Sequence, residues 1–193
     1  MMLFRTSGLN FRRKRRKMKL STAKSAAAWA VEILIVLLVA FVLVYCAGMR
    51  VTMVGNSMES TVSDGSQILV NRFIYNVKSP KSGDVIVFLP NGNEKSHYYV
   101  KRVIGVPGDV IDIVDDKVYL NGSDTPLDEP YLAEAMNQHE TYHFEVPENC
   151  YFMMGDNRNY SLDARYWQNH YISRDKMVAK VFFEYFPTPK VIH

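Results

Sequence analysis

Residues 25–49 constrain the fold of this chain more than any other feature, because 25 consecutive positions contain a single charged side chain, Glu32. A helix rises about 1.5 Å per residue, so this run would extend roughly 37 Å, enough to cross the ~30 Å apolar core of a bilayer. Glu32 lies near the N-terminal end of the run, where its carboxylate can reach the polar interface. The run therefore predicts one transmembrane helix.

A cleaved signal peptide is the alternative interpretation of the same run, with Cys46 and Gly48 as the small residues at the cut. The apolar core of a signal peptide is ordinarily only ~7–15 residues long. The greater length of this run favours a retained anchor over residues 25–49.

Charge is distributed very unevenly along the chain. Nine Lys and Arg precede Glu32 without one acidic residue, whereas the chain from Glu32 onward has fourteen Lys and Arg against twenty Asp and Glu. Positive charge beside an apolar helix stays on the cytoplasmic side, so we expect residues 1–24 to be a disordered cytoplasmic tail and 50–193 an extracytoplasmic domain. The predicted location is the plasma membrane, in a single pass, with the lipid bilayer as partner. The basic run at 12–17 is interpreted as an orientation signal, and no nucleic acid partner is expected.

Residues 50–193 have the length of one ordinary domain and the pattern of a β protein. Short apolar runs between Gly, Pro, Ser and Asn predict strands; they are residues 67–70, 84–88, 98–104, 110–114, 117–120, 141–146, 150–154 and 177–186. Asn91-Gly92 and Asn121-Gly122 predict turns, and 132–137 is either one helical turn or a loop. We expect a mainly antiparallel β domain with a small lobe over 111–149. Two cysteines exclude a disulfide scaffold.

Three polar stretches carry the residues with catalytic potential: 54–62 (VGNSMESTV), 99–109 (YVKRVIGVPGD) and 155–165 (GDNRNYSLDAR). A serine such as Ser57 needs an adjacent base to become a nucleophile. Lys101 can act as that base only where apolar surroundings lower its pKa from about 10.4, and a drop of ~3 units costs ~4 kcal/mol. The alternative is an ordinary exposed lysine. Asp163 and Arg165, two apart in an extended chain, point the same way and can pair; the alternative there is a solvated loop.

The three stretches resemble, in order and spacing, the motifs of the bacterial type I signal peptidases. The similarity extends to residues 81–88 and 119–132, and so covers nearly everything from the anchor to Pro187. It implies a signal-peptidase-like β domain in which Ser57 is the nucleophile and Lys101 the general base. It assigns to Ser161 the hydroxyl that hydrogen-bonds the lysine amine. Asp163, Arg165, Asp156 and Arg102 are the supporting residues it implies.

The resemblance also implies the reaction. A membrane-anchored serine endopeptidase of this family removes N-terminal signal peptides from exported preproteins after small-x-small sites, through a Ser/Lys dyad and an acyl-enzyme. Two shallow apolar pockets are then expected, and the residues predicted to bind substrate are Val51, Met53, Val54 and Met58. The partners are the exported preproteins, with no obligatory protein partner. The five histidines have no metal-ligand spacing and no Gly-rich phosphate loop occurs, so no metal and no cofactor are expected.

Three alternative functions are known for proteins with related motifs. A pilin-dedicated signal peptidase differs only in substrate, and the sequence leaves it open. A non-catalytic pilus-assembly factor of the same family would lack the dyad, whereas Ser57 and Lys101 are both present. A soluble self-cleaving repressor also uses Ser and Lys, but the apolar run and the lack of a DNA-binding segment disfavour it.

The chain departs from the family pattern at two positions beside Ser57. Gly55 stands where some members have a serine that joins the oxyanion hole, so backbone N–H groups, including that of Ser57, would have to form it. Ser60 stands where proline is usual. Proline pre-sets φ near −65° and, where the backbone geometry is compatible, stabilises a protein by about 0.4–1 kcal/mol. We therefore expect Ser60→Pro to be tolerated, to leave the cleavage site unchanged and to raise the rate by no more than roughly tenfold.

Overall fold

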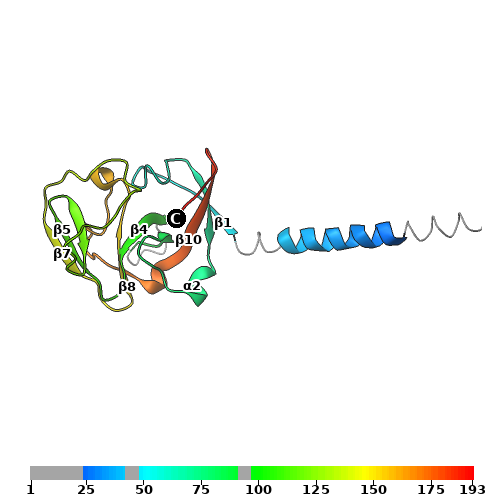
Figure 1. Cartoon of the computed structure of the whole chain (residues 1–193), viewed down its shortest axis with the longest axis horizontal. Helices are drawn as coiled ribbons and strands as arrows, with labels where there is room; N and C mark the ends of the chain where they lie inside the picture. Colours follow the sequence, from blue (N-terminus) through cyan, green and yellow to red (C-terminus); the bar gives the residue numbers. More distant parts are fainter. Residues whose placement is uncertain (1–23, 42–47, 91–96) are drawn as a thin grey trace, which may run out of the picture. The chain divides into compact units, whose positions relative to one another are not determined.

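The computed structural model describes residues 24–41, 48–90 and 97–193, which belong to two compact units, Met1–Cys46 and Ala47–His193. In the first unit, Lys24–Phe41 is a helix of 18 residues that is long and apolar enough to cross a membrane (Figure 1). Its large apolar side chains, such as Trp29 and Leu34, are exposed. The basic residues before Lys24 and the predicted turn at Asn91-Gly92 lie outside the described residues.

The end of the predicted anchor differs from the structure. Strand β1 (Gly48–Thr52) begins inside the predicted span, and Gly48 and Met49 pair with Asn71 and Val70 of β2. Met49 and Val51 pack against the core of the β domain. The boundary at residue 49 was therefore placed too late, because composition alone does not separate burial in lipid from burial in a protein core. Residues 42–47 lie outside the described part of the chain.

One large antiparallel sheet forms most of the second unit, with the strand order β1-β2-β10-β3-β4-β8-β9 and with β11 pairing to β10. Beyond β1, its strands are β2 (Gln67–Asn71), β3 (Val85–Phe88), β4 (Tyr99–Gly105), β8 (Cys150–Met154), β9 (Ile172–Ser173), β10 (Met177–Phe186) and β11 (Lys190–Val191). The predicted strands at 67–70, 84–88, 98–104, 150–154 and 177–186 are confirmed. The sequence did not predict the helix α2 (Ile74–Val77) or the two-residue strands β9 and β11.

A second sheet has the order β6-β5-β7 and consists of β5 (Val110–Val114), β6 (Lys117–Leu120) and β7 (Tyr142–Glu145). It lies at the end of the domain opposite β1 (Figure 1). Asp115 and Asp116 join β5 to β6 with φ of 49° and 62°, the left-handed geometry of a tight hairpin. The predicted fold class, mainly antiparallel β after one apolar helix, is confirmed, and residues 132–137 are a loop.

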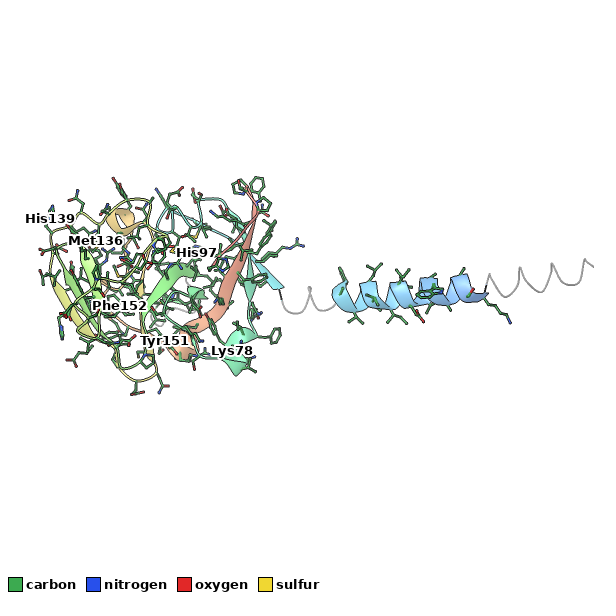
Figure 2. The ribbon with its side chains drawn as sticks, in the orientation of Figure 1. Lys78, His97, Met136, His139, Tyr151 and Phe152 are labelled. Atoms are coloured by element: carbon green, nitrogen blue, oxygen red, sulfur yellow. The ribbon has the colours of Figure 1, made fainter. Side chains whose placement is uncertain are left out.

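Separate core clusters position the segments of the site. Met53, Met58 and Val62, from the loop after β1, pack against β2, β3 and β10. The small sheet packs against β4 and β8 through residues such as Ile111 and Phe152. Tyr151, the neighbour of Phe152, belongs to a different cluster, as expected for alternating side chains of a strand (both are labelled in Figure 2). Strands β4 and β8 are thus held from both faces.

Candidate active site

A groove of about 620 Å³ contains both Ser57 and Lys101 in its lining. The lining comes from three segments: β1 with the loop after it, the start of β4 with the residues before it, and the third polar stretch. Its members are Val51, Thr52, Met53, Val54, Gly55, Asn56, Ser57, His97, Tyr98, Tyr99, Val100, Lys101, Tyr160 and Leu162. The structure therefore brings all three sequence stretches to one groove.

Lys101 lies in the middle of β4, opposite Ile86 of β3, and only 4% of the residue is exposed. Burial lowers the pKa of its amine to about 8; Asp163 opposes this shift and Arg165 adds to it. About a tenth of the amine is then neutral at pH 7, far more than for a lysine in water. Lys101 is not the ordinary exposed lysine of the alternative interpretation.

Ser57 lies in a tight loop directly after β1. The N–H of Val62 donates to the carbonyl of Met58 (2.7 Å), and the fully buried Met58 side chain fixes the loop to the core. At the start of the loop Gly55 has φ of +88° and donates its N–H to Asp64 Oδ1 (2.7 Å). The half-buried Ser57 is therefore carried on a segment with little freedom to move.

Gly155 packs between Ser57 and Ser161. A Cβ atom at this position would lie 2.2 Å from Ser161 Oγ and 2.3 Å from the carbonyl oxygen of Ser57, so only glycine fits. The carbonyl of Ser57 also accepts the N–H of Asn157 (3.1 Å). The third polar stretch is thus in direct contact with the loop that carries Ser57.

Ser161 is buried, and among the described residues its Oγ has no hydrogen-bond partner. The hydrogen bond to Lys101 that the resemblance implies is therefore not made in this structure. A buried hydroxyl left without any partner costs about 1–3 kcal/mol, so this group calls for an explanation.

Asp163 and Arg165 pair as the sequence predicted. Arg165 Nε lies 2.8 Å from Asp163 Oδ1, Nη2 donates to Oδ2 (2.9 Å), and both side chains are buried. Asp163 Oδ2 also accepts the N–H of Gly155 (3.0 Å). The pair thereby holds the glycine that separates Ser57 from Ser161.

Arg102 and Asp156 form a second buried pair. Arg102 Nε and Nη2 donate to the two carboxylate oxygens of Asp156 (2.8 and 2.7 Å). The hydroxyl of Thr61 donates to Asp156 Oδ2 (2.5 Å), so the loop of Ser57 is tied to the same carboxylate. This arrangement links β4, the third stretch and the nucleophile loop.

The predicted substrate-binding residues divide into two groups. Val51, Met53 and Val54 line the groove, whereas Met58 does not, because its side chain is fully buried in the core below the loop. The prediction for Met58 was wrong, since a pattern match does not tell which side of a loop a residue faces.

Sequence reasoning missed the aromatic part of the groove, formed by Tyr98, Tyr99 and Tyr160, and the exposed Leu162 beside it. Tyr98 and Tyr99 directly precede Val100 and Lys101, which was an available signal. His97 also lines the groove, well apart from His139 (Figure 2). Within residues 24–41, 48–90 and 97–193, no group of three or more His, Cys, Asp or Glu side chains is arranged to hold a metal ion.

The backbone conformation of Ser60 is incompatible with proline at this position. Its φ is +84°, and its Oγ donates to the carbonyl of Tyr131 (2.6 Å). A proline ring holds φ near −65°, so Ser60→Pro would force the loop into another path. The expectation that Ser60→Pro is tolerated is therefore wrong.

We instead expect Ser60→Gly to be more stable than Ser60→Ala by about 1 kcal/mol, and Ser60→Pro to be the least stable of the three. Both small variants lose the Oγ hydrogen bond, but only glycine lacks the Cβ that makes positive φ unfavourable. Urea unfolding midpoints measure the difference. A Ser60→Pro variant at least as stable as Ser60→Ala would contradict the observed backbone geometry.

Comparisons with a family model and with individual proteins all match this chain to signal peptidases. The family described as "Signal peptidase, peptidase S26" matches residues 26–186. Signal peptidase IB of Staphylococcus aureus is 34% identical over 183 residues, which are 84% of this chain and 92% of that protein. Signal peptidase I of Bacillus licheniformis is 39% identical over 120 residues (58% of this chain), and the probable signal peptidase I-2 of Synechocystis is 34% identical over 140 residues (70% of this chain). Each of these two alignments spans 62% of the relative's length.

A crystal structure of a signal peptidase I from Enterococcus faecalis is also similar. It is 30% identical, has a TM-score of 0.46, and the match covers 54% of this chain and 97% of that chain.

Proposed function

This chain belongs to the signal peptidase family, peptidase S26, and we propose that it is a membrane-anchored serine endopeptidase that removes N-terminal signal peptides from exported preproteins. The observation that carries the proposal is that Ser57 lines the same groove as a buried lysine, Lys101, whose pKa is lowered to about 8. A serine needs a base, and a neutral amine is one. The reaction is hydrolysis of a peptide bond after a small-x-small site.

In the proposed first step, neutral Lys101 Nζ takes the proton of Ser57 Oγ while this oxygen attacks the carbonyl carbon of the scissile bond. Backbone N–H groups, among them that of Ser57, stabilise the oxyanion. The lysine ammonium then donates its proton to the leaving amine, and an ester joins Ser57 to the signal peptide.

In the second step, neutral Lys101 takes a proton from water, which attacks the ester carbonyl; the ester bond breaks, the signal peptide leaves as a carboxylic acid, and the lysine ammonium returns its proton to Ser57 Oγ. The groove that would hold the peptide is lined by Val51, Met53 and Val54 on one side. The apolar side chains of Val51 and Val54 suit the small residues before the cleaved bond, whereas the side chain of Met53 is buried in the core. Ser161, unpartnered beside Gly155, is available to accept or donate a hydrogen bond during the cycle.

The anchor has an energetic role in this proposal. The helix Lys24–Phe41 meets the length and composition needed to span a bilayer, and the basic residues before it direct the N-terminus to the cytoplasm. Enzyme and preprotein then share one membrane, so their effective concentration rises without any new contact.

The test is incubation of the detergent-solubilised full chain with a panel of preproteins and pilin precursors, with the new N-termini identified by mass spectrometry. We expect cleavage directly after small-x-small sites. Cleavage of pilin precursors alone would support the pilin-dedicated enzyme. If no substrate is cleaved under conditions in which a known signal peptidase cleaves the same panel, the peptidase proposal is wrong and the assembly-factor alternative is favoured.

A further inference from the structure

Three residues after β6 touch every catalytic segment without lining the groove. They are Glu129, Pro130 and Tyr131, here called the bridging segment, and they lie between β6 and β7, the strands that flank β5 in the small sheet. None of the three is among the groove residues. Any effect they have on the reaction must therefore act through other residues.

The first contact joins the bridging segment to the third polar stretch. Glu129 binds Arg158 with both carboxylate oxygens: Arg158 Nη1 donates to Oε2 (2.9 Å), and Nη2 donates to Oε1. Exposure is 9% for the Glu129 side chain and 1% for that of Arg158. Arg158 Nε also donates to the carbonyl of Gly155 (3.2 Å), the glycine that packs against Ser57 and Ser161. Glu129 thus orients the guanidinium that holds this glycine.

The second contact reaches the lysine strand. The guanidinium of Arg102, the neighbour of Lys101 in β4, lies over the ring of Tyr131, 3.9 Å from its centroid. The Tyr131 hydroxyl donates to Glu129 Oε1 (2.7 Å), so the ring is fixed by the same carboxylate that binds Arg158. A cation over an aromatic face is attracted by the ring, most strongly where water is excluded.

The third contact reaches the nucleophile loop. Ser60, three residues after Ser57, donates its Oγ to the carbonyl of Tyr131 (2.6 Å). The bridging segment therefore contacts the loop of Ser57, the strand of Lys101 and the stretch of Ser161 at once.

We propose that Glu129 and Tyr131 are positioning residues of the signal peptidase reaction, which set the relative placement of the segments carrying Ser57, Lys101 and Ser161 from outside the groove. This inference rests on the proposed function. A buried bidentate ion pair and a ring fixed by it define orientation more narrowly than single hydrogen bonds. Misplacement of a reacting group by about 1 Å can lower a rate by ~100-fold, so the loss of these contacts should act on kcat.

The experiment compares two pairs of variants in the full chain. Glu129→Gln removes the charge that faces Arg158, and Asp128→Asn removes the same charge from the exposed neighbouring residue. Tyr131→Leu removes the ring under Arg102, whereas Tyr131→Phe keeps the ring and loses only the hydroxyl. For each, kcat and KM are measured on one preprotein well below the melting temperature, together with the pH profile of kcat/KM, which reports the free enzyme.

We expect Glu129→Gln and Tyr131→Leu to lower kcat by roughly 10- to 100-fold with KM changed less than about twofold. Asp128→Asn should match the wild type, and Tyr131→Phe should lose far less than Tyr131→Leu. In Glu129→Gln the midpoint of the pH profile should lie above that of the wild type, because a looser site admits water to Lys101 and restores its charged form. A merely structural role would lower the melting temperature and leave kcat per folded molecule and the pH midpoint unchanged, and that result would overturn the proposal.

Amide hydrogen exchange provides a readout that needs no substrate. Glu129→Gln should exchange faster than Asp128→Asn over residues 57–62 and 155–163, and equal exchange there would also overturn the positioning role. If the wild-type chain cleaves no preprotein while this difference in exchange is present, the proposed peptidase function fails and the bridging role stands.

Discussion

Ser57→Ala abolishes preprotein cleavage and leaves the melting temperature of the β domain within a degree or two of the wild type. The loss should be roughly 10⁴-fold or more, because no other hydroxyl occupies the position of the nucleophile. The fold should tolerate the change, since the loop is held by the buried Met58 and by the backbone bond from Val62 rather than by the Ser57 hydroxyl. Processing assays and thermal melts on the same samples measure both quantities.

Ser63→Ala is the matched control for this variant. Ser63 lies in the same part of the chain, its Oγ donates to Glu59 (3.0 Å), and it does not line the groove. It should keep activity within a few fold of the wild type. A Ser57→Ala variant that cleaves as fast as Ser63→Ala would remove Ser57 from the mechanism.

Replacement of Lys101 should be equally damaging to activity. Lys101→Arg should be as inactive as Lys101→Met, because a guanidinium stays protonated at any usable pH and cannot act as a base. In the wild type, kcat/KM, whose pH dependence reports the free enzyme, should rise with pH and reach half its maximum near pH 8, where the buried amine loses its proton. An active arginine variant, or a rate that does not change between pH 6 and pH 10, would rule out a neutral lysine base.

The same lysine should lower the stability of the fold at neutral pH. Its pKa is about 8 in the folded chain and 10.5 in the reference state, so the unfolded chain binds more protons between these values and stability rises with pH in that window. Below pH 8 the full penalty applies, about 3 kcal/mol at 1.36 kcal/mol per pKa unit. Lys101→Met should therefore be more stable than the wild type at pH 7, with the advantage gone above about pH 10.5. Urea unfolding at pH 7 and at about pH 10.5 measures the difference in stability between the variant and the wild type. A difference that does not change with pH would show that the charge of Lys101 is not its cause.

The strands show how far local pattern determines structure. The predicted runs at 67–70, 110–114 and 150–154 became β2, β5 and β8, because short apolar runs between turn residues have few other stable arrangements. The pairing of Asp163 with Arg165 was predicted correctly but for the wrong reason, because the two residues meet in a turn, in which the N–H of Tyr166 donates to the carbonyl of Asp163 (2.9 Å), and not in an extended chain. The order and spacing of the three polar stretches were sufficient to identify the family.

Other features depend on segments that are distant in the sequence. The predicted end of the anchor is wrong because the apolar Met49 packs against the core of the β domain. The prediction for Met58 is wrong because its side chain packs beneath the loop and not in the groove. The positive φ of Ser60 could not be predicted, because the residue type serine does not indicate a left-handed backbone conformation. Glu129 and Arg158 are 29 residues apart, and nothing local indicates that one binds the other.

The sequence by itself determined the family, the strand-forming segments and the identities of Ser57 and Lys101 as the candidate dyad. Only the tertiary structure decided that β3 and the neighbouring strands enclose Lys101 and lower its pKa to about 8, and that Gly155 meets both Ser57 and Ser161. The physical reason is that a pKa and a contact both depend on the complete surroundings of a group. Those surroundings are assembled from segments far apart in the chain, whereas a sequence motif describes only the neighbours on either side.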